Sequence, residues 1–108
     1  MDNETEKKIT ELQTIEQNLQ RFLAQKQQFQ TQMMELESAL NEIPKTKEAH
    51  KIIGNIMVSI DKKDLESDLK SKKEMIELRL KSIEKQEQRL REDADVLQKE
   101  VSEKLKKK

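Results

Sequence analysis

His50 is the only histidine in the chain, and the chain contains no cysteine. These two residue types supply many of the nucleophiles, general bases and soft metal ligands of proteins, so little remains for catalysis or metal binding. The single glycine, Gly54, also excludes a glycine-rich phosphate-binding loop. We interpret the lone histidine as a packing or surface residue. The sequence therefore predicts a protein that is not an enzyme and that holds no metal or other cofactor.

Charged residues make up 41% of the chain, with 22 basic and 22 acidic side chains that leave a net charge of zero. The carboxylates are interspersed with basic residues, a pattern typical of solvated i, i+4 pairs on helix surfaces. Nucleic-acid binding requires a basic surface, so this balance argues against nucleic acid as a partner. The basic run at residues 104–108 leaves a nucleic-acid-binding tail as an alternative, although no aromatic residues are interleaved with it.

Half of the 108 residues are Ala, Glu, Lys, Leu or Arg, a composition typical of long helices and coiled coils. Disorder is the competing interpretation, but the zero net charge and the regular apolar spacing favour folded helices. No apolar run reaches membrane-spanning length, and residues 1–8 lack the apolar core of a signal peptide. Together with the absence of cysteine, these features predict a cytoplasmic protein that does not enter a membrane.

Two seams of apolar residues, spaced alternately by three and four positions, predict two helices of a coiled coil. The first helix should span about residues 5–43 and end before Pro44, because proline disfavours helical geometry in the residue before it. The second should span about residues 62–105, with Asp61 or Asp64 capping its start. The first seam is Leu12, Ile15, Leu19, Phe22, Lys26, Phe29, Met33, Leu36, Leu40 and Ile43, and the second is Leu69, Lys73, Ile76, Leu80, Ile83, Glu87, Leu90, Ala94, Leu97 and Val101.

The two seams match each other as an antiparallel pair centred on residues 54–55. In this register Lys26 faces Ile83, one helical turn from Glu87, so these two charged seam residues are not expected to pair. We interpret them as tolerated because long side chains can keep their charges in water. The alternatives are a role in fixing the register or in loosening the coiled coil. The matched pairs include Leu12–Leu97, Leu19–Leu90, Phe29–Leu80 and Leu40–Leu69.

The apolar stretch at residues 52–58 predicts a β-hairpin between the helices, within a connection at about residues 44–61. Gly54 and Asn55 form a two-residue turn signal, because glycine supplies the positive φ that such a turn requires. The turn pairs Ile53 with Ile56 and, further from the turn, Ala49 with Ile60. A lone hairpin is marginal in water and leaves two open strand edges. Closing several hairpins into a β-barrel would remove the edges and bury the oligomerisation residues Ile52, Ile53, Ile56, Met57, Val58 and Ile60.

The predicted fold is therefore mainly α. It consists of a long antiparallel two-helix coiled coil, joined by a single β-hairpin that assembles with other subunits into a β-barrel. Residues 1–108 are expected to form one such unit.

Three sequence blocks resemble the β-class subunits of prefoldin, the hexameric chaperone of archaea. They are Gln25–Gln27, Lys51–Val58 and the run from Glu77 to Arg89. The resemblance covers about residues 25–91. His50 stands where the family often carries Tyr, and both ends of the chain are more polar than is usual in the family.

The resemblance implies a hexamer of two α-class and four β-class subunits, whose hairpins form double β-barrels that carry six coiled-coil tentacles. It implies an ATP-independent holdase that binds unfolded proteins at the coiled-coil tips and delivers them to a group II chaperonin. The candidate client-binding residues are the distal apolar ones, with ordinary seam packing as the alternative for part of the set. They are Ile9, Leu12, Ile15, Leu97, Val101 and Leu105.

A structural role is the main alternative function. A coiled-coil tether or scaffold that dimerises through its hairpin would carry the same two seams and the same turn.

Overall fold

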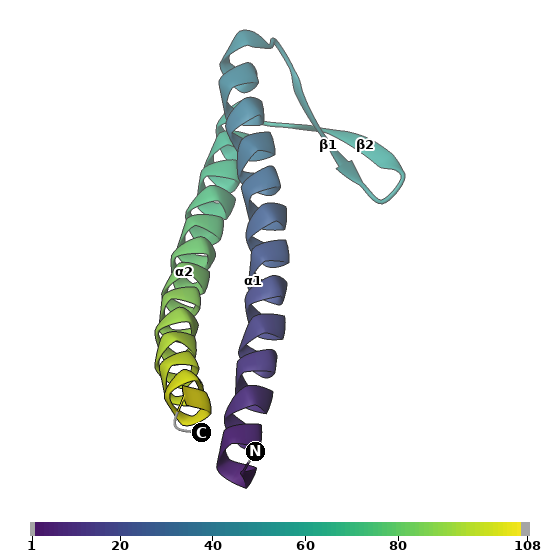
Figure 1. The fold of residues 1–108 in the computed structure, drawn as a ribbon. Helices are drawn as coiled ribbons and strands as arrows, with labels where there is room; N and C mark the ends of the chain where they lie inside the picture. The colour runs from purple at the N-terminus through teal and green to yellow at the C-terminus, as the bar shows by residue number, and fades with distance from the viewer. Residues whose placement is uncertain (1, 107–108) are drawn as a thin grey trace. The chain divides into compact units, whose positions relative to one another are not determined.

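Residues 2–106 are described by the computed structural model, and they form two helices and one two-stranded antiparallel sheet (Figure 1). The elements in chain order are α1 (Asn3–Glu42), a 3₁₀ turn η1 (Ile43–Lys45), β1 (Ala49–Ile53), β2 (Ile56–Ile60) and α2 (Lys62–Lys106). The predicted fold class of two long helices joined by a β-hairpin is confirmed. Neither helix is long and apolar enough, within the described residues, to cross a membrane.

Aspartate side chains cap the start of both helices. The backbone N–H of Thr5 donates to Asp2 Oδ1 at 2.7 Å, and the backbone N–H of Lys63 donates to Asp61 Oδ1 at 2.8 Å. These bonds satisfy N–H groups in the first turn, which have no partner within the helix. Asp61 was one of the two residues predicted to cap α2, whereas the cap at Asp2 was not predicted.

Pro44 ends α1 as predicted. The α-helical hydrogen bonding stops at Glu42, and Pro44 lies inside the 3₁₀ turn that follows. Thr46 closes this turn, because its backbone N–H and its hydroxyl both donate to the carbonyl oxygen of Ile43, at 3.2 and 2.9 Å. The chain then leaves in an extended conformation toward β1.

The strand pairing of the hairpin is the one that the turn signal predicts. Ile53 pairs with Ile56 beside the turn, and Ala49 pairs with Ile60 at the other end. Gly54 has φ +61°, whereas Asn55 does not have a positive φ. Of the two common two-residue hairpin turns, type II′ requires a positive φ only at its first residue and type I′ requires it at both. The turn is therefore of the type II′ kind.

The chain divides into two compact units. The terminal unit consists of Met1–Gln27 and Lys81–Lys108, and the hairpin unit consists of Gln28–Leu80. All twenty predicted seam residues are buried or half-buried within these units. The apolar seams therefore hold the two helices together, as their spacing predicts.

Within the terminal unit, α1 and α2 run antiparallel. Lys8 Nζ on α1 lies 2.9 Å from Glu100 Oε2 on α2, whereas Lys26 Nζ lies 3.0 Å from Glu87 Oε1. Residue numbers thus rise along one helix as they fall along the other. The pairing of Lys26 with Glu87 corrects the expectation that these residues do not meet: lysine is long enough to reach one turn along the partner helix. Glu87 is also one of the few buried residues of the unit.

Within the hairpin unit, an ion pair and a cation–π contact each join a seam residue of one helix to a residue outside the seam on the other. Lys73 Nζ lies 3.7 Å from Glu37 Oε1, and the guanidinium of Arg79 lies 5.9 Å from the ring centroid of Phe29. The second distance is within the range of a cation–π interaction. These partners are within one residue of the predicted antiparallel register.

Candidate functional site

The hairpin exposes large apolar side chains on both of its faces. Ile53 and Ile56 lie on one face with exposed fractions of 58% and 66%, whereas Ile52 and Met57 lie on the other with 68% and 64%. Alternate residues of a strand point to opposite faces, so no single covering layer could bury all four. The hairpin of one chain is therefore an unburied, two-sided apolar surface.

The chain covers its own hairpin only at the base. Ala49 at the start of β1 is 8% exposed, and Ile43 in the preceding turn is 6% exposed. Ile60 is half-buried and Val58 is 38% exposed, so both are better covered than the residues beside the turn. The outer part of the hairpin is thus exposed, whereas its base is partly buried within the chain. Four of the six predicted oligomerisation residues lie in that outer part.

Of the candidate client-binding residues in the terminal unit, one is exposed and the others are half-buried. Leu105, in the last turn of α2, is 46% exposed. Ile15 of α1 and Leu97 of α2 line the same hollow of about 320 Å³. Ile9 and Leu12 line another hollow, of about 410 Å³, on the surface of α1. The half-buried residues are Ile9, Leu12, Ile15, Leu97 and Val101.

Val96 is a further apolar residue of this region and was not among the predicted client-binding residues. It is 56% exposed and lines the hollow together with Ile15 and Leu97. Its position directly before a seam residue places it beside the seam and not in it. The sequence signal for this exposed apolar residue was a valine at a position that lies outside the seam.

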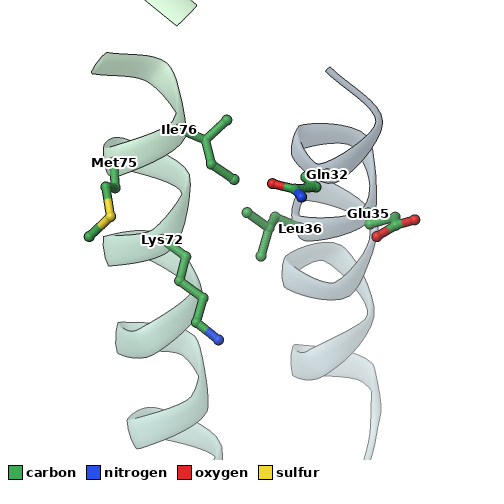
Figure 2. A pocket seen from close by; sticks show the side chains of 6 residues that line it. All are labelled: Gln32, Glu35, Leu36, Lys72, Met75 and Ile76. Carbon is green, nitrogen blue, oxygen red and sulfur yellow. The ribbon is translucent and has the colours of Figure 1, made fainter. Parts of the chain in front are cut away.

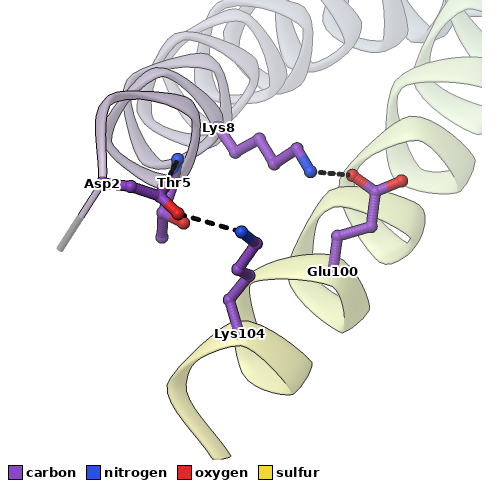
Figure 3. A network of polar contacts seen from close by, with 5 residues as sticks. All are labelled: Asp2, Thr5, Lys8, Glu100 and Lys104. Carbon is purple, nitrogen blue, oxygen red and sulfur yellow. Dashed lines mark hydrogen bonds and ion pairs between the residues drawn. The ribbon is translucent and has the colours of Figure 1, made fainter. Parts of the chain in front are cut away.

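A network of polar contacts joins the two helices of the terminal unit near their ends (Figure 3). Lys104 Nζ lies 2.9 Å from Asp2 Oδ2, and the Lys8–Glu100 pair lies beside it. Thr5, whose N–H donates to Asp2, is only 2% exposed. Asp2 thus both caps α1 and bridges to α2.

This network affects the ionisation of its members. Hydrogen bonds from Thr5 and from the Lys104 ammonium lower the pKa of the Asp2 carboxyl well below its usual range. Asp2 in turn raises the pKa of Lys104, and Glu100 raises the pKa of Lys8. Asp2, Lys8 and Lys104 therefore remain ionised around neutral pH. Solvent and salt screen the attraction within the network, because its members lie at the surface.

The hairpin unit contains a separate hollow of about 350 Å³ between α1 and α2 (Figure 2). Leu36 and Ile76 point toward one another across it, and Lys72 reaches in from α2. Met75, at its edge, is 55% exposed. Leu36 and Ile76, one seam residue from each helix, are therefore partly open on this side.

His50, the single histidine of the sequence, lies on the hairpin. Its side chain is exposed on β1, and its Nε2 atom lies 4.0 Å from Glu48 Oε2. Among residues 2–106, no three His, Asp or Glu side chains are grouped so that they could hold a metal ion.

Comparison with known proteins identifies the family. The family model described as "Prefoldin subunit" matches residues 6–108, which is nearly the whole chain. The chain belongs to the prefoldin subunit family. Prefoldin subunits are chaperone subunits, and the resemblance that the hairpin and helix blocks carry is confirmed.

Individual relatives agree with this assignment. The chain is 34% identical over 105 residues to "Prefoldin subunit beta" of Sulfurisphaera tokodaii, an alignment that covers 94% of this chain and 84% of the relative. It is 36% identical over 87 residues to the same subunit of Archaeoglobus fulgidus, which covers 78% of this chain and 75% of the relative. The crystal structure of the prefoldin beta subunit from Thermococcus strain KS-1 shares the fold, with a TM-score of 0.87, 29% identity and coverage of 96% of this chain and 94% of that chain.

Proposed function

We propose that this chain is a β-class subunit of a hexameric, ATP-independent holdase. The single observation that carries the assembly part is the hairpin, which exposes Ile53 and Ile56 on one face and Ile52 and Met57 on the other. Two open strand edges and a two-sided apolar surface require further strands, and a closed barrel of hairpins supplies them. Two α-class partners and four β-class copies are the assembly that the family resemblance implies.

Unfolded polypeptides are the proposed clients, and the terminal unit is the proposed site that binds them. The hollow lined by Ile15, Val96 and Leu97 offers partly exposed apolar surface from both helices, and Leu105 is exposed nearby in sequence. Such surface can bind apolar segments of a non-native chain without selecting one sequence. The six candidate residues from Ile9 to Leu105 thus remain the proposed client-binding set.

A group II chaperonin is the proposed recipient of the client, and the cytoplasm is the proposed location. Both follow from the family resemblance.

The assembly is tested by native mass spectrometry of the complex isolated from its host. A hexamer with two copies of an α-class subunit is the expected result. A defined dimer of this chain alone, without holdase activity, would instead favour the structural tether.

The client site is tested by removing residues 1–15 and 97–108 from this subunit in the reconstituted complex. The truncated complex should retain its oligomeric mass, because the hairpin unit is intact, but should no longer suppress the aggregation of a chemically denatured client. Full suppression by the truncated complex would place the client site elsewhere.

A further inference from the structure

The terminal unit contains a second hollow between α1 and α2, in addition to the one around Ile15 and Leu97. This second hollow, of about 250 Å³, has Phe22 and Leu90 as its apolar lining. Its rim consists of Asn18, Gln86 and Arg89. Both hollows thus expose one seam residue from each helix.

The two hollows occupy equivalent positions of the heptad repeat. We call the alternating seam positions a and d, as in a coiled-coil heptad, and the position directly before each a is then g. Both hollows expose one d residue from each helix. Each hollow is also flanked by one g residue from each helix. On α1, the g residues are Glu11 and Asn18, one heptad apart. On α2, they are Asp93 and Gln86, also one heptad apart. The hollows therefore form a row on one flank of the helix pair, with a repeat of about 10.5 Å at 1.5 Å per residue.

The ends of this row differ in charge. Glu11 and Asp93 place two carboxylates at the rim of the first hollow, whereas the rim of the second hollow has no carboxylate. One heptad beyond Asp93 along α2, Glu100 forms its ion pair with Lys8. Lys8 takes the d position there, so a charged pair replaces the apolar lining and the row stops.

We propose, on the basis of the chaperone function proposed above, that this row of hollows binds an amphipathic α-helical segment of the client. Apolar side chains at positions i and i+7 of the client helix occupy the two hollows. A lysine or arginine of the client next to residue i pairs with Glu11 and Asp93. The client helix thus lies along one flank of the terminal unit as a third helix.

The spacing between the two hollows favours a client segment that is helical over one that is an extended strand. In a helix, residues i and i+7 lie on the same face and are about 10.5 Å apart. In a strand at about 3.3 Å per residue, the residues on one face are spaced by about 6.6 or 13 Å, and neither spacing matches the row. The residue three positions along a strand has nearly the right distance but points to the opposite face. Only the helical segment places consecutive apolar groups in both hollows.

Two labelled peptides of identical composition, each about 21 residues long, test the proposal by fluorescence anisotropy with the assembled complex. One peptide has leucines at heptad spacing with a lysine beside the first, and the other has the same residues in strict apolar–polar alternation. The heptad peptide is expected to bind about tenfold more tightly. Equal affinity of the two peptides would overturn the proposal.

Substitutions in this subunit locate the binding on the flank. Val96→Gln should weaken binding of the heptad peptide about fivefold, because it removes an apolar group from the first hollow. Leu23→Gln is the matched control, because Leu23 is 44% exposed in the same unit but lies at an e position, on the other flank. Binding that is weakened equally by both substitutions would contradict the location.

A charge-reversed variant tests the rim without altering the apolar lining of the hollow. Glu11→Lys combined with Asp93→Lys should reverse the preference, so that a heptad peptide with glutamate in place of the lysine becomes the tighter ligand. An unchanged preference for the lysine peptide would overturn the role of the two carboxylates.

Suppression of aggregation of a denatured client, measured with the same preparations, separates this inference from the proposed function. Suppression without any preference between the two peptides would overturn the helix inference and leave the holdase intact. Loss of suppression in the wild-type complex would overturn the holdase, whichever peptide binds.

Discussion

Lys26 Nζ lies 3.0 Å from Glu87 Oε1, and both residues belong to the apolar seam of the terminal unit. Glu87 is only 6% exposed, and Arg91 approaches its other carboxylate oxygen at 3.8 Å. A buried carboxylate is tolerated when cations compensate its charge, and a charged pair inside a seam is satisfied in one alignment of the helices and not in others. This pair therefore supports the register-fixing alternative for the charged seam residues.

Replacing Lys26 alone should destabilise the subunit. Lys26→Met leaves Glu87 buried with only Arg91 as its cation, so we expect the free energy of unfolding to fall by about 1–3 kcal/mol. Adding Glu87→Leu should restore most of this loss, because the seam then becomes apolar in that layer. Urea unfolding of the complex, followed by far-ultraviolet circular dichroism at a fixed protein concentration, measures both changes.

Lys81→Met is the matched control for this prediction, because Lys81 is an exposed residue of the same unit. It should change the free energy of unfolding by less than about 0.5 kcal/mol. A double variant less stable than Lys26→Met would show that the pair itself stabilises the seam beyond compensating for its burial.

The exposed apolar surface of the hairpin predicts that a substitution there disrupts assembly without disrupting the helices. Ile56→Asp places a charge on a side chain that is 66% exposed in the single chain and that the proposed barrel would bury. We expect the complex to dissociate while the separated chains remain helical, because α1 and α2 do not depend on that side chain. Size-exclusion chromatography with light scattering gives the mass, and an unchanged hexamer would refute the proposed interface.

Leu78→Asp is the control for the assembly prediction. Leu78 is 67% exposed on α2 and lies outside the hairpin, so the same change there should leave the oligomeric mass unaltered. Dissociation by both variants would mean that α2 also takes part in the interface.

The elements of this fold could be predicted from the sequence because their signals are local and periodic. The alternating spacing of the seams fixed which face of each helix is covered, and Pro44 marked the end of the first helix. The hairpin was predictable residue by residue because a two-residue turn at Gly54 leaves only one register for the strands.

The contacts between the helices were less predictable, because they depend on how far each side chain reaches. The seam register places Lys26 opposite Ile83, but the lysine stem extends one turn along α2 to Glu87. The hollow beside Val96 likewise depends on which side chains of one helix are left uncovered by the other helix. The periodicity of the apolar residues identifies the seam, but it does not show where hollows lie on the surface next to the seam.

The positive φ of Gly54 predicts that alanine destabilises the hairpin more at position 54 than at position 55. Gly54→Ala should destabilise the hairpin by about 1 kcal/mol, because φ +61° is unfavourable for a residue with a Cβ even though the site has space for that atom. Asn55→Ala should have a smaller effect, because the φ of Asn55 is not positive. Hydrogen exchange of the β1 and β2 amides in the assembled complex measures both. Equal effects would show that the turn does not require glycine.

Asp2 is predicted to stabilise the first turn of α1 in two separable ways. Asp2→Asn keeps an acceptor for the Thr5 N–H but removes the charge that pairs with Lys104, whereas Asp2→Ala removes both. Hydrogen exchange at Thr5 should therefore be fastest in Asp2→Ala and intermediate in Asp2→Asn, and high salt should reduce only the part due to the ion pair.

The pH dependence of this protection has a defined sign. Thr5 and Lys104 lower the pKa of Asp2 in the folded state. The stabilisation that Asp2 gives to the first turn of α1 is therefore complete at pH values above the ordinary pKa range of a carboxyl group. The contribution is lost as the pH falls through the lowered value. The ratio of Thr5 exchange rates between Asp2→Ala and the wild type should thus be constant near neutral pH and approach one only in strong acid. A ratio that changed between pH 6 and 8 would assign the effect to another group.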